Sequence, residues 1–245
     1  WVGNAFWLLV AIRLYLGFSR PVDPAQESDR DTARRLLEAG TGDHLSFMTL
    51  WKSNRYFFHG DSYVAYRVSN GIALTLGAPV GLDISSEFEQ FAAEQGWAVA
   101  WYSVNAQFAD AHPELKRLQV AEEAVLNCES VEFKGKKFQN VRTARNKAEK
   151  EGITTRWTTW KELDIASIAR ITALSEDWVS DKALPEMGFT LGGLEEMMVD
   201  GTRLLLAESA DGTLHGVTSW MPVYENGAIV GYLSLIHISE PTRRT

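Results

Sequence analysis

Two blocks of short apolar runs, each separated by turn residues, restrict the fold of this chain more than any other feature of its sequence. In the first block, the runs 55–60, 62–69 and 72–81 are rich in aromatic and β-branched residues, which favour strands. Asn70-Gly71 separates two of these runs, and this pair is typical of a hairpin because both positions of a type I′ turn need positive φ. The first block is therefore predicted to contain a sheet with a tight hairpin.

Helices are predicted between and before these strands. Residues 31–39 and 85–95 carry apolar side chains at helical spacing, and Gly96 ends the second helix. The run 98–104 is almost continuously apolar, which predicts a strand in the centre of a sheet. The runs 44–51 and 119–127 are also expected to be strands.

The second block repeats the mixture of strands and helices. A strand at 153–160 is followed by a predicted helix at 164–181 and a short helix at 195–199. Three further strands are expected at 203–209, 215–224 and 228–233, with turns at Asp211-Gly212 and Asn226-Gly227. Strands interleaved with helices in two similar blocks predict an α/β chain of the α+β kind, with two units built around mixed sheets.

The two ends of the chain have a different character. Residues 1–18 are apolar except for Asn4 and Arg13, and we expect 1–20 to be the end of a transmembrane helix, followed by a linker at 21–30. A buried or interfacial amphipathic helix is the alternative. At the other end, residues 233–243 resemble the translation of an adapter used in preparing sequencing libraries, so we expect 233–245 to be an assembly artefact.

Composition excludes several functional classes. A formal net charge of −8 argues against a protein that coats nucleic acid in general, although a confined basic patch is compatible with it. Cys128 is the single cysteine, so no intrachain disulfide can form, and we expect it to be a small buried apolar residue. The five histidines show no metal-ligand spacing, and no metal site is expected.

A local reversal of charge lies between residues 134 and 156. This stretch contains eight basic side chains against two acids, Glu149 and Glu151. A glycine-broken loop, 134–137, leads into a predicted basic helix at 139–151. Because a helix N-terminus presents unpaired N–H groups and a positive dipole end, the loop and helix together predict an anion site.

Several segments then carry a specific family resemblance. Residues 47–232 resemble the cytoplasmic catalytic domain of phosphatidylglycerol lysyltransferases, and the matching pieces occur in the family's order: LTLGAPVG, GWAVAWYSV, VAEEAVLN, FKGKKFQNVRTARNKAEKEG, PEMGFTLGGLEE and GVTSWMPVY. The resemblance implies tandem GNAT-like acyltransferase folds, at 31–152 and 153–232, after a bundle of membrane helices. It also implies transfer of an aminoacyl group from charged tRNA to phosphatidylglycerol, with no further cofactor.

Within this resemblance, the basic segment is expected to bind substrate. Arg142, Arg145 and Lys150 are the candidates for contact with the tRNA acceptor end or the lipid phosphate, because guanidinium groups suit phosphate oxygens. Further candidates on the same segment are Asn146, Lys136 and Lys137. The alternative is a solvated helix face whose cations form salt bridges with nearby glutamates.

Acidic and polar residues elsewhere complete the expected site. Glu122 and Glu123 are the candidate catalytic carboxylates, one of them orienting an ammonium group or acting as a base toward the lipid hydroxyl. Glu186 is expected to hold an α-ammonium group, and Phe189 and Ser219 are further substrate-binding candidates. Packing or surface roles are the alternatives for each of them.

The expected function is a membrane-anchored, tRNA-dependent aminoacyltransferase, with lysine the favoured amino acid. The catalytic domain is expected on the cytoplasmic side of a multi-pass protein of the cell membrane, where the reaction lowers negative surface charge and so confers resistance to cationic peptides. A tRNA-dependent aminoacyltransferase acting on peptidoglycan precursors is one alternative. A non-catalytic domain that binds lipid headgroups is another.

Overall fold

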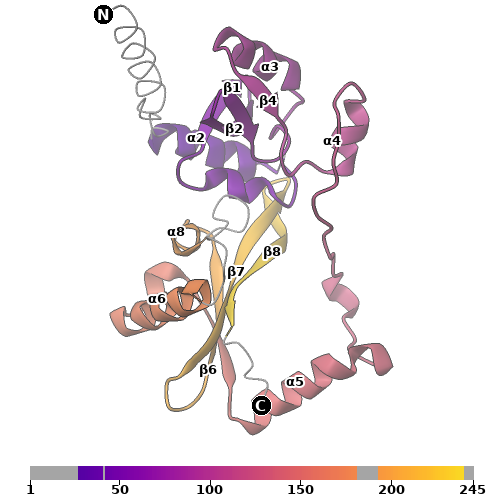
Figure 1. The fold of residues 1–245 in the computed structure, drawn as a ribbon. Helices are drawn as coiled ribbons and strands as arrows, with labels where there is room; N and C mark the ends of the chain where they lie inside the picture. The colour runs from indigo at the N-terminus through magenta and orange to yellow at the C-terminus, as the bar shows by residue number, and fades with distance from the viewer. Residues whose placement is uncertain (1–26, 41, 181–192, 240–245) are drawn as a thin grey trace, which may run out of the picture.

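The computed structural model describes residues 27–40, 42–180 and 193–239, and these residues contain two four-stranded sheets (Figure 1). The expected end of a transmembrane helix at 1–20 lies outside them, as do the linker residues 21–26. In the part of the chain that is described, no helix is both long and apolar enough to cross a bilayer.

The first sheet has the strand order β1 (Arg55–His59), β2 (Ser62–Ser69), β3 (Ile72–Thr75) and β4 (Ala98–Ala100). The first three strands are antiparallel. Asn70 and Gly71 have φ of 51° and 75° at the turn between β2 and β3, which confirms the predicted hairpin.

The fourth strand corrects one prediction. β4 pairs with β3 in parallel and is the last strand of the described sheet, so the prediction of a central strand at 98–104 is wrong. Trp101, the residue after β4, packs on aromatic side chains of two helices instead of beside another strand: its ring lies 5.6 Å from that of Phe88 and 5.0 Å from that of Phe108.

Helices lie on both faces of the first sheet. Tyr63 and Ala65 of β2 belong to a core shared with α2 (Glu27–Glu38), which confirms the helix predicted at 31–39. Val64 and Tyr66 of β2 point into the opposite core, where they pack with α3 (Ser85–Glu94), which confirms the helix predicted at 85–95. Because successive side chains of a strand alternate between faces, β2 is buried from both sides.

The strand predicted at 44–51 is wrong, because Ser46–Leu50 form the 3₁₀ helix η1. Local hydrogen bonds favour this turn: the Asp43 carboxylate accepts from the backbone N–H of Leu45 at 3.0 Å, and the Ser46 hydroxyl accepts from that of Asp43 at 2.8 Å. The apolar side chains of η1 are buried beneath α2 and the sheet, so the run is apolar because it belongs to the core.

A long connection joins the two sheets. It starts with α4 (Ala106–Ala111), continues through η2 (Cys128–Ser130) and η3 (Lys136–Phe138), and ends in α5 (Gln139–Lys150). Figure 1 shows it passing along one side of the molecule from the first sheet to α5.

The strand predicted at 119–127 does not form, although its sequence alternates as strands do. No strand in the described part of the chain lies beside it, so its backbone has no ladder to join. Val120 and Leu126 are therefore exposed, at 63% and 69%. The expectation of a buried Cys128 is wrong for the same reason, since this residue is also exposed.

The second sheet is fully antiparallel, in the order β5 (Thr154–Thr158), β6 (Arg203–Glu208), β7 (Leu214–Glu225) and β8 (Ala228–Ser239). The turn between the last two strands has φ of 51° at Asn226 and 78° at Gly227, as predicted. β8 continues through 233–239 beside β7. The interpretation of 233–245 as an assembly artefact stays a prediction.

Helices cover one face of this second sheet. After the 3₁₀ turn η4 (Trp160–Glu162), α6 (Ile165–Ser180) confirms the helix predicted at 164–181, and α8 (Leu194–Met197) confirms the short one. The buried residues of this face form one cluster with the helices: Ile171, Met197, Leu204, Leu206, Leu214 and Val217.

The β7–β8 hairpin joins the two halves of the molecule. Met221 of β7 is 2% exposed and belongs to the same core as Phe47 and Trp51 of the first half. At the tip of the hairpin, the backbone of Asn226 lies against Gly40, so closely that a Cβ on Gly40 would stand 1.9 Å from the Asn226 nitrogen. The two sheets therefore share a core, while the expected domain boundary near Gly152 stays a prediction.

Candidate functional site

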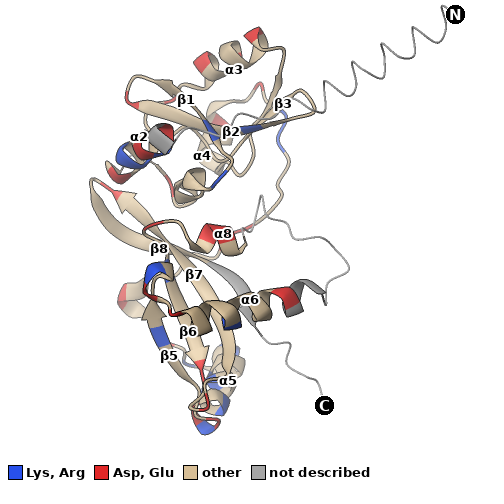
Figure 2. Ribbon diagram, turned by 90° about the vertical axis from the view of Figure 1, so that its left-hand side faces the viewer, with Lys and Arg blue, Asp and Glu red and all other residues tan. Residues whose placement is uncertain are grey.

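The basic helix predicted from the sequence is α5, and Figure 2 colours its Lys and Arg positions blue. It has no interior glycine or proline, and it ends where Gly152 adopts φ of +68°. The backbone N–H of Ile153 then donates to the carbonyl of Ala148 at 2.9 Å, as in a Schellman cap. No buried residue lies on α5, and Arg145, Lys147 and Lys150 are exposed to solvent.

Two cations of α5 form salt bridges within the helix. Arg145 Nε lies 3.4 Å from Glu149, and Lys147 Nζ lies 3.7 Å from Glu151, both at four-residue spacing. These salt bridges are the ones expected under the alternative interpretation, in which α5 is a solvated helix face without a binding role. Exposed pairs of this kind contribute about 0.5 kcal/mol or less, so an incoming phosphate can displace either glutamate.

The other candidate cations lie in the same segment. Lys136 and Lys137 are exposed in η3, and Asn146 and Lys150 are exposed on α5. Arg142 is already engaged, because its Nη1 donates to two backbone carbonyls of the preceding turn. All six predicted polar residues of the basic run therefore lie in one segment of the chain, η3 and α5.

The candidate carboxylates lie in the extended connection and have different neighbours. Glu122 accepts a hydrogen bond from the side chain of Gln119 at 3.2 Å. Glu123 forms an ion pair with Nε2 of His44, in the loop after α2. Residues 119–127 do not form the predicted strand, so the two glutamates are placed by these separate contacts.

The structure does not bring the candidate acids and the basic helix together. The ion pair of Glu123 holds the connection beside the loop that follows α2, whereas α5 lies at the opposite end of the molecule, below the second sheet (Figure 1). Within the described residues, the acids and the cations therefore form two separate surfaces.

Three candidates lie elsewhere. Glu186 and Phe189 fall outside the described residues. Ser219 is 2% exposed on β7, on the face of the strand that also buries Val217 and Met221. The substrate-binding roles of these three residues stay predictions.

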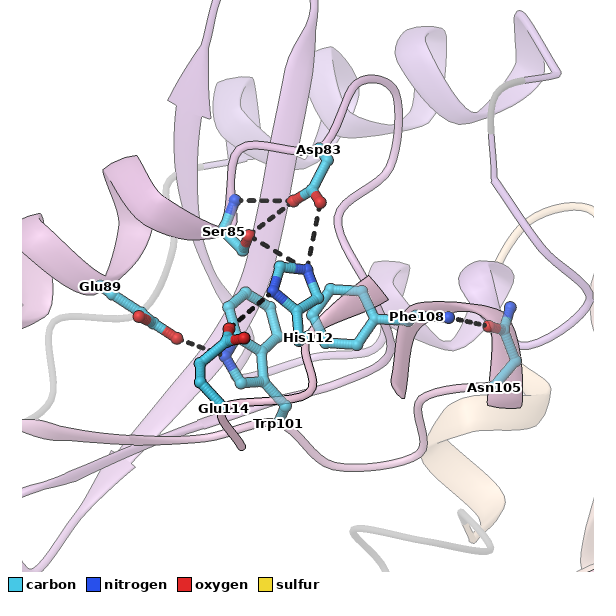
Figure 3. Close-up of polar contacts among 8 residues, drawn as sticks. All are labelled: Asp83, Ser85, Glu89, Trp101, Asn105, Phe108, His112 and Glu114. Carbon is cyan, nitrogen blue, oxygen red and sulfur yellow. Dashed lines mark hydrogen bonds and ion pairs between the residues drawn. The ribbon is translucent and has the colours of Figure 1, made fainter. Parts of the chain in front are cut away.

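A cluster of polar side chains that the sequence did not reveal lies where α3 and α4 meet (Figure 3). The Asp83 carboxylate accepts from the Ser85 hydroxyl at 2.6 Å, and its other oxygen lies 3.1 Å from His112 Nε2. His112 Nδ1 lies 3.2 Å from Glu114, and the His112 ring lies tilted against that of Phe108, with 4.3 Å between the ring centres. One histidine thus contacts two carboxylates and a serine.

This cluster is a connection between helices. The Asp83 carboxylate also accepts from the backbone N–H of Ser85 at the start of α3, while His112 is the residue that ends α4. Partial burial acts to raise the pKa of Asp83, but the hydrogen bonds from Ser85 and the nearby His112 outweigh it, and the pKa is lowered. Ser85 is 4% exposed, so its hydroxyl is not accessible as a nucleophile.

A local signal for part of this cluster was present in the sequence. An aspartate two residues before a serine at the start of an apolar-periodic helix is typical of helix capping. The contact with His112 comes from 29 residues away and depends on tertiary packing. Among the described residues, this cluster included, no group of three or more His, Cys, Asp or Glu side chains has the arrangement needed for a metal ion.

Comparison with known proteins adds to these observations. The profile of the family described as "Phosphatidylglycerol lysyltransferase, C-terminal" matches residues 33–232. An uncharacterized protein of Corynebacterium glutamicum is 51% identical over 95% of this chain and 31% of its own length. The phosphatidylglycerol lysyltransferase of Staphylococcus xylosus is 26% identical over 81% of this chain and 24% of its own length. The chain thus spans less than a third of the length of either relative.

Two solved structures share the fold. L-PGS from Bacillus licheniformis superposes with a TM-score of 0.73 at 22% identity, over 89% of this chain and 69% of that chain. The C-terminal domain of a putative lysylphosphatidylglycerol synthetase from Agrobacterium fabrum gives a TM-score of 0.70 at 16% identity, over 87% and 70%. These similarities confirm the predicted mixed α+β fold, while its assignment to the GNAT type stays a prediction.

Proposed function

Because the chain belongs to the phosphatidylglycerol lysyltransferase family over residues 33–232, we propose that the protein transfers a lysyl group to phosphatidylglycerol. The donor in this proposal is charged tRNA, bound through its acceptor end. The relatives that carry a functional name are lysyltransferases or lysylphosphatidylglycerol biosynthesis proteins, which supports an enzyme of this kind.

The exposed cationic surface of η3 and α5 is the observation that carries the tRNA part of the proposal. It lies in a chain of net charge −8, so its positive charge is local. RNA binding releases counterions for each phosphate that a cation neutralises, and it needs cations that are accessible to solvent. Lys136, Arg145 and Lys150 meet this requirement, since each is exposed.

The reaction exchanges one ester for another. The bond between the lysyl carbonyl carbon and a ribose oxygen breaks, and a bond from that carbon to a glycerol oxygen of the lipid forms. The glycerol hydroxyl proton ends on the released ribose hydroxyl, so the reaction needs no oxidant or reductant. Aligning the two substrates contributes several kcal/mol through proximity alone, of the about 7–11 kcal/mol available to well-oriented reactants.

Glu122 or Glu123 is the proposed base that assists the proton transfer. Glu123 already lies against His44, and Glu122 is exposed. Separate Glu122→Gln and Glu123→Gln variants identify which of the two is needed, because the amide keeps the shape of the carboxylate but does not accept a proton.

The proposed product changes the charge of the membrane surface. Phosphatidylglycerol carries one negative charge, and an added lysyl group brings two ammonium groups. We place the reaction at the cytoplasmic face of the cell membrane, where this change weakens the attraction of cationic peptides.

The experiment uses the full-length protein in vesicles that contain phosphatidylglycerol, with lysyl-tRNA labelled on the amino acid. Labelled lipid is the expected result. Absence of labelled lipid with every charged tRNA rules out the transferase, and label in a peptidoglycan precursor identifies the alternative acceptor.

A pair of double variants tests the cationic surface. Arg145→Ala/Lys150→Ala is expected to raise KM for lysyl-tRNA about tenfold near 0.1 M salt, because two phosphate contacts are lost. Lys52→Ala/Lys161→Ala removes two positive charges that pair with Glu195 and Asp200, away from α5, and serves as the control. Equal KM values for the two variants contradict the assignment of α5.

A further inference from the structure

The guanidinium group of Arg142 forms hydrogen bonds with the backbone of the protein itself. Its Nη1 donates to the carbonyl of Phe133 at 2.9 Å and to that of Gly135 at 2.8 Å. Both carbonyls precede the helix that carries Arg142. The side chain thus folds back from the first turns of α5 onto the turn formed by residues 133–138, called here the lysine turn.

The lysine turn has two further supports. The rings of Phe133 and Phe138 meet edge to face at 5.4 Å, and Lys137 Nζ lies 4.9 Å from the centre of the Phe138 ring. Gly135 adopts φ of +81°, which reverses the chain at little steric cost. Each of these contacts lies within residues 133–142.

Other sources of order in the turn are weak. Neither Gly135 nor Phe138 caps its helix through a side chain. The element that η3 contacts extensively is α5, and the residues of the turn are exposed except for Phe138. A solvent-exposed turn with few packing partners orders itself through local contacts. Phe138 N–H donates to the Gly135 carbonyl at 3.3 Å and Lys134 Nζ to Glu132 at 2.9 Å, while Arg142 supplies the two hydrogen bonds from a charged donor to the backbone of the turn.

We propose that Arg142 is a positioning residue that holds Lys136 and Lys137 at the N-terminal end of the helix that carries Arg145 and Lys150, and that it acts on RNA through the lysine turn instead of contacting phosphate itself. This inference rests on the proposed function, since it concerns the same surface. A preformed turn lowers the conformational entropy that the two lysines lose on binding a phosphate backbone. Loss of Arg142 therefore weakens the contacts of other residues.

The first test needs no RNA. The full-length protein is digested briefly with trypsin, and cleavage after Lys134 and Lys136 is followed by mass spectrometry. Arg142→Met is expected to speed cleavage about tenfold, because two hydrogen bonds from a charged donor are lost. Arg142→Lys retains donors for both carbonyls and is expected to restore most of the protection.

The matched control is Arg145→Met, which removes a cation from the same helix without touching the turn. It is expected to leave cleavage after Lys134 and Lys136 at the rate of the unaltered protein. Equal cleavage rates in Arg142→Met and Arg145→Met overturn the positioning role.

The second test is a double-mutant cycle on affinity for an RNA hairpin that copies a tRNA acceptor stem. Arg142→Met is expected to weaken binding about fivefold in the unaltered protein but to have almost no effect in Lys136→Ala/Lys137→Ala, because coupled residues are non-additive. Arg145→Met is expected to weaken RNA binding by the same factor in the unaltered protein and in Lys136→Ala/Lys137→Ala.

An equal loss from Arg142→Met in both backgrounds overturns the proposal and shows that Arg142 contacts phosphate directly. Absence of RNA binding by the unaltered protein contradicts the tRNA part of the proposed function and removes this role of the turn in RNA binding. The proteolysis result still decides whether Arg142 orders the turn, so the two failures are distinguishable.

Discussion

Three charged side chains of this protein stabilise the structure around them through specific contacts. Arg142 holds a turn, Glu123 pairs with His44, and Asp83 joins two helices. In each case one end of the contact was visible in the sequence as a charged residue. The other end was a backbone carbonyl or a side chain far along the chain, which no local pattern identifies.

The Asp83 cluster makes stability depend on pH. The pKa of Asp83 is lowered in the folded protein, so its charged form stabilises the fold above the pKa of an unfolded aspartate, about 3.9. This contribution is lost as the pH falls through the lowered folded pKa. Ser85 and His112 contact the Asp83 carboxylate, and Glu114 contacts His112 from the other side of the ring.

Asp83→Ala is expected to destabilise the protein by about 1 kcal/mol at pH 7, because the helix start loses its acceptor and His112 loses a partner. The difference is expected to shrink as the pH falls through the lowered folded pKa of Asp83, because the carboxyl then becomes protonated. Thermal unfolding from pH 2.5 to 7 measures it, with Asp110→Ala as a control on an exposed pair with Arg117. A difference that stays constant over this range contradicts the prediction.

At the scale of elements, periodic patterns predicted most of the helices and hairpins. The predictions for 85–95, for 164–181 and for the hairpin at Asn70-Gly71 are confirmed, because a helix or tight turn is decided by residues close in sequence. Strand predictions at 44–51 and 119–127 are wrong. A strand also needs a neighbouring strand, and its own sequence does not say whether one is present.

Hydrogen exchange tests whether residues 119–127 of the connection are unpaired. Amides of 119–126 are expected to exchange almost as fast as those of an unfolded chain, because they have no ladder partner in the described structure. Amides of β2, which pair on both sides, are expected to be slowed by a factor of at least roughly 10³. Protection of 119–126 comparable to that of β2 contradicts the prediction.

At the scale of the whole molecule, the β7–β8 hairpin couples the two sheets. Its Met221 lies in the core of the first half, and its tip packs on the backbone at Gly40. A substitution at this contact is therefore expected to destabilise both halves of the molecule.

Gly40→Ala is expected to destabilise the protein by more than about 2 kcal/mol, because φ is +84° and the added methyl meets the Asn226 nitrogen at 1.9 Å. Gly60→Ala is the matched control: φ is +58°, but nothing lies within 4 Å of its added carbon. Gly60→Ala is expected to lower the free energy of unfolding by about 1 kcal/mol, through backbone strain alone. Urea unfolding followed by tryptophan fluorescence compares the two, and equal losses contradict the close contact.

The sequence by itself determined the mixed α+β class, the main helices, the glycine turns and the local basic segment 134–150, because each depends on residues that are near neighbours in the chain. The family followed from the order of several such segments. Tertiary structure decided that β4 ends its sheet, that 119–127 stays unpaired, that the acids lie apart from α5, and that Arg142 faces backbone carbonyls. These outcomes depend on which distant groups compete for the same partner, and that competition is resolved only when the whole chain has folded.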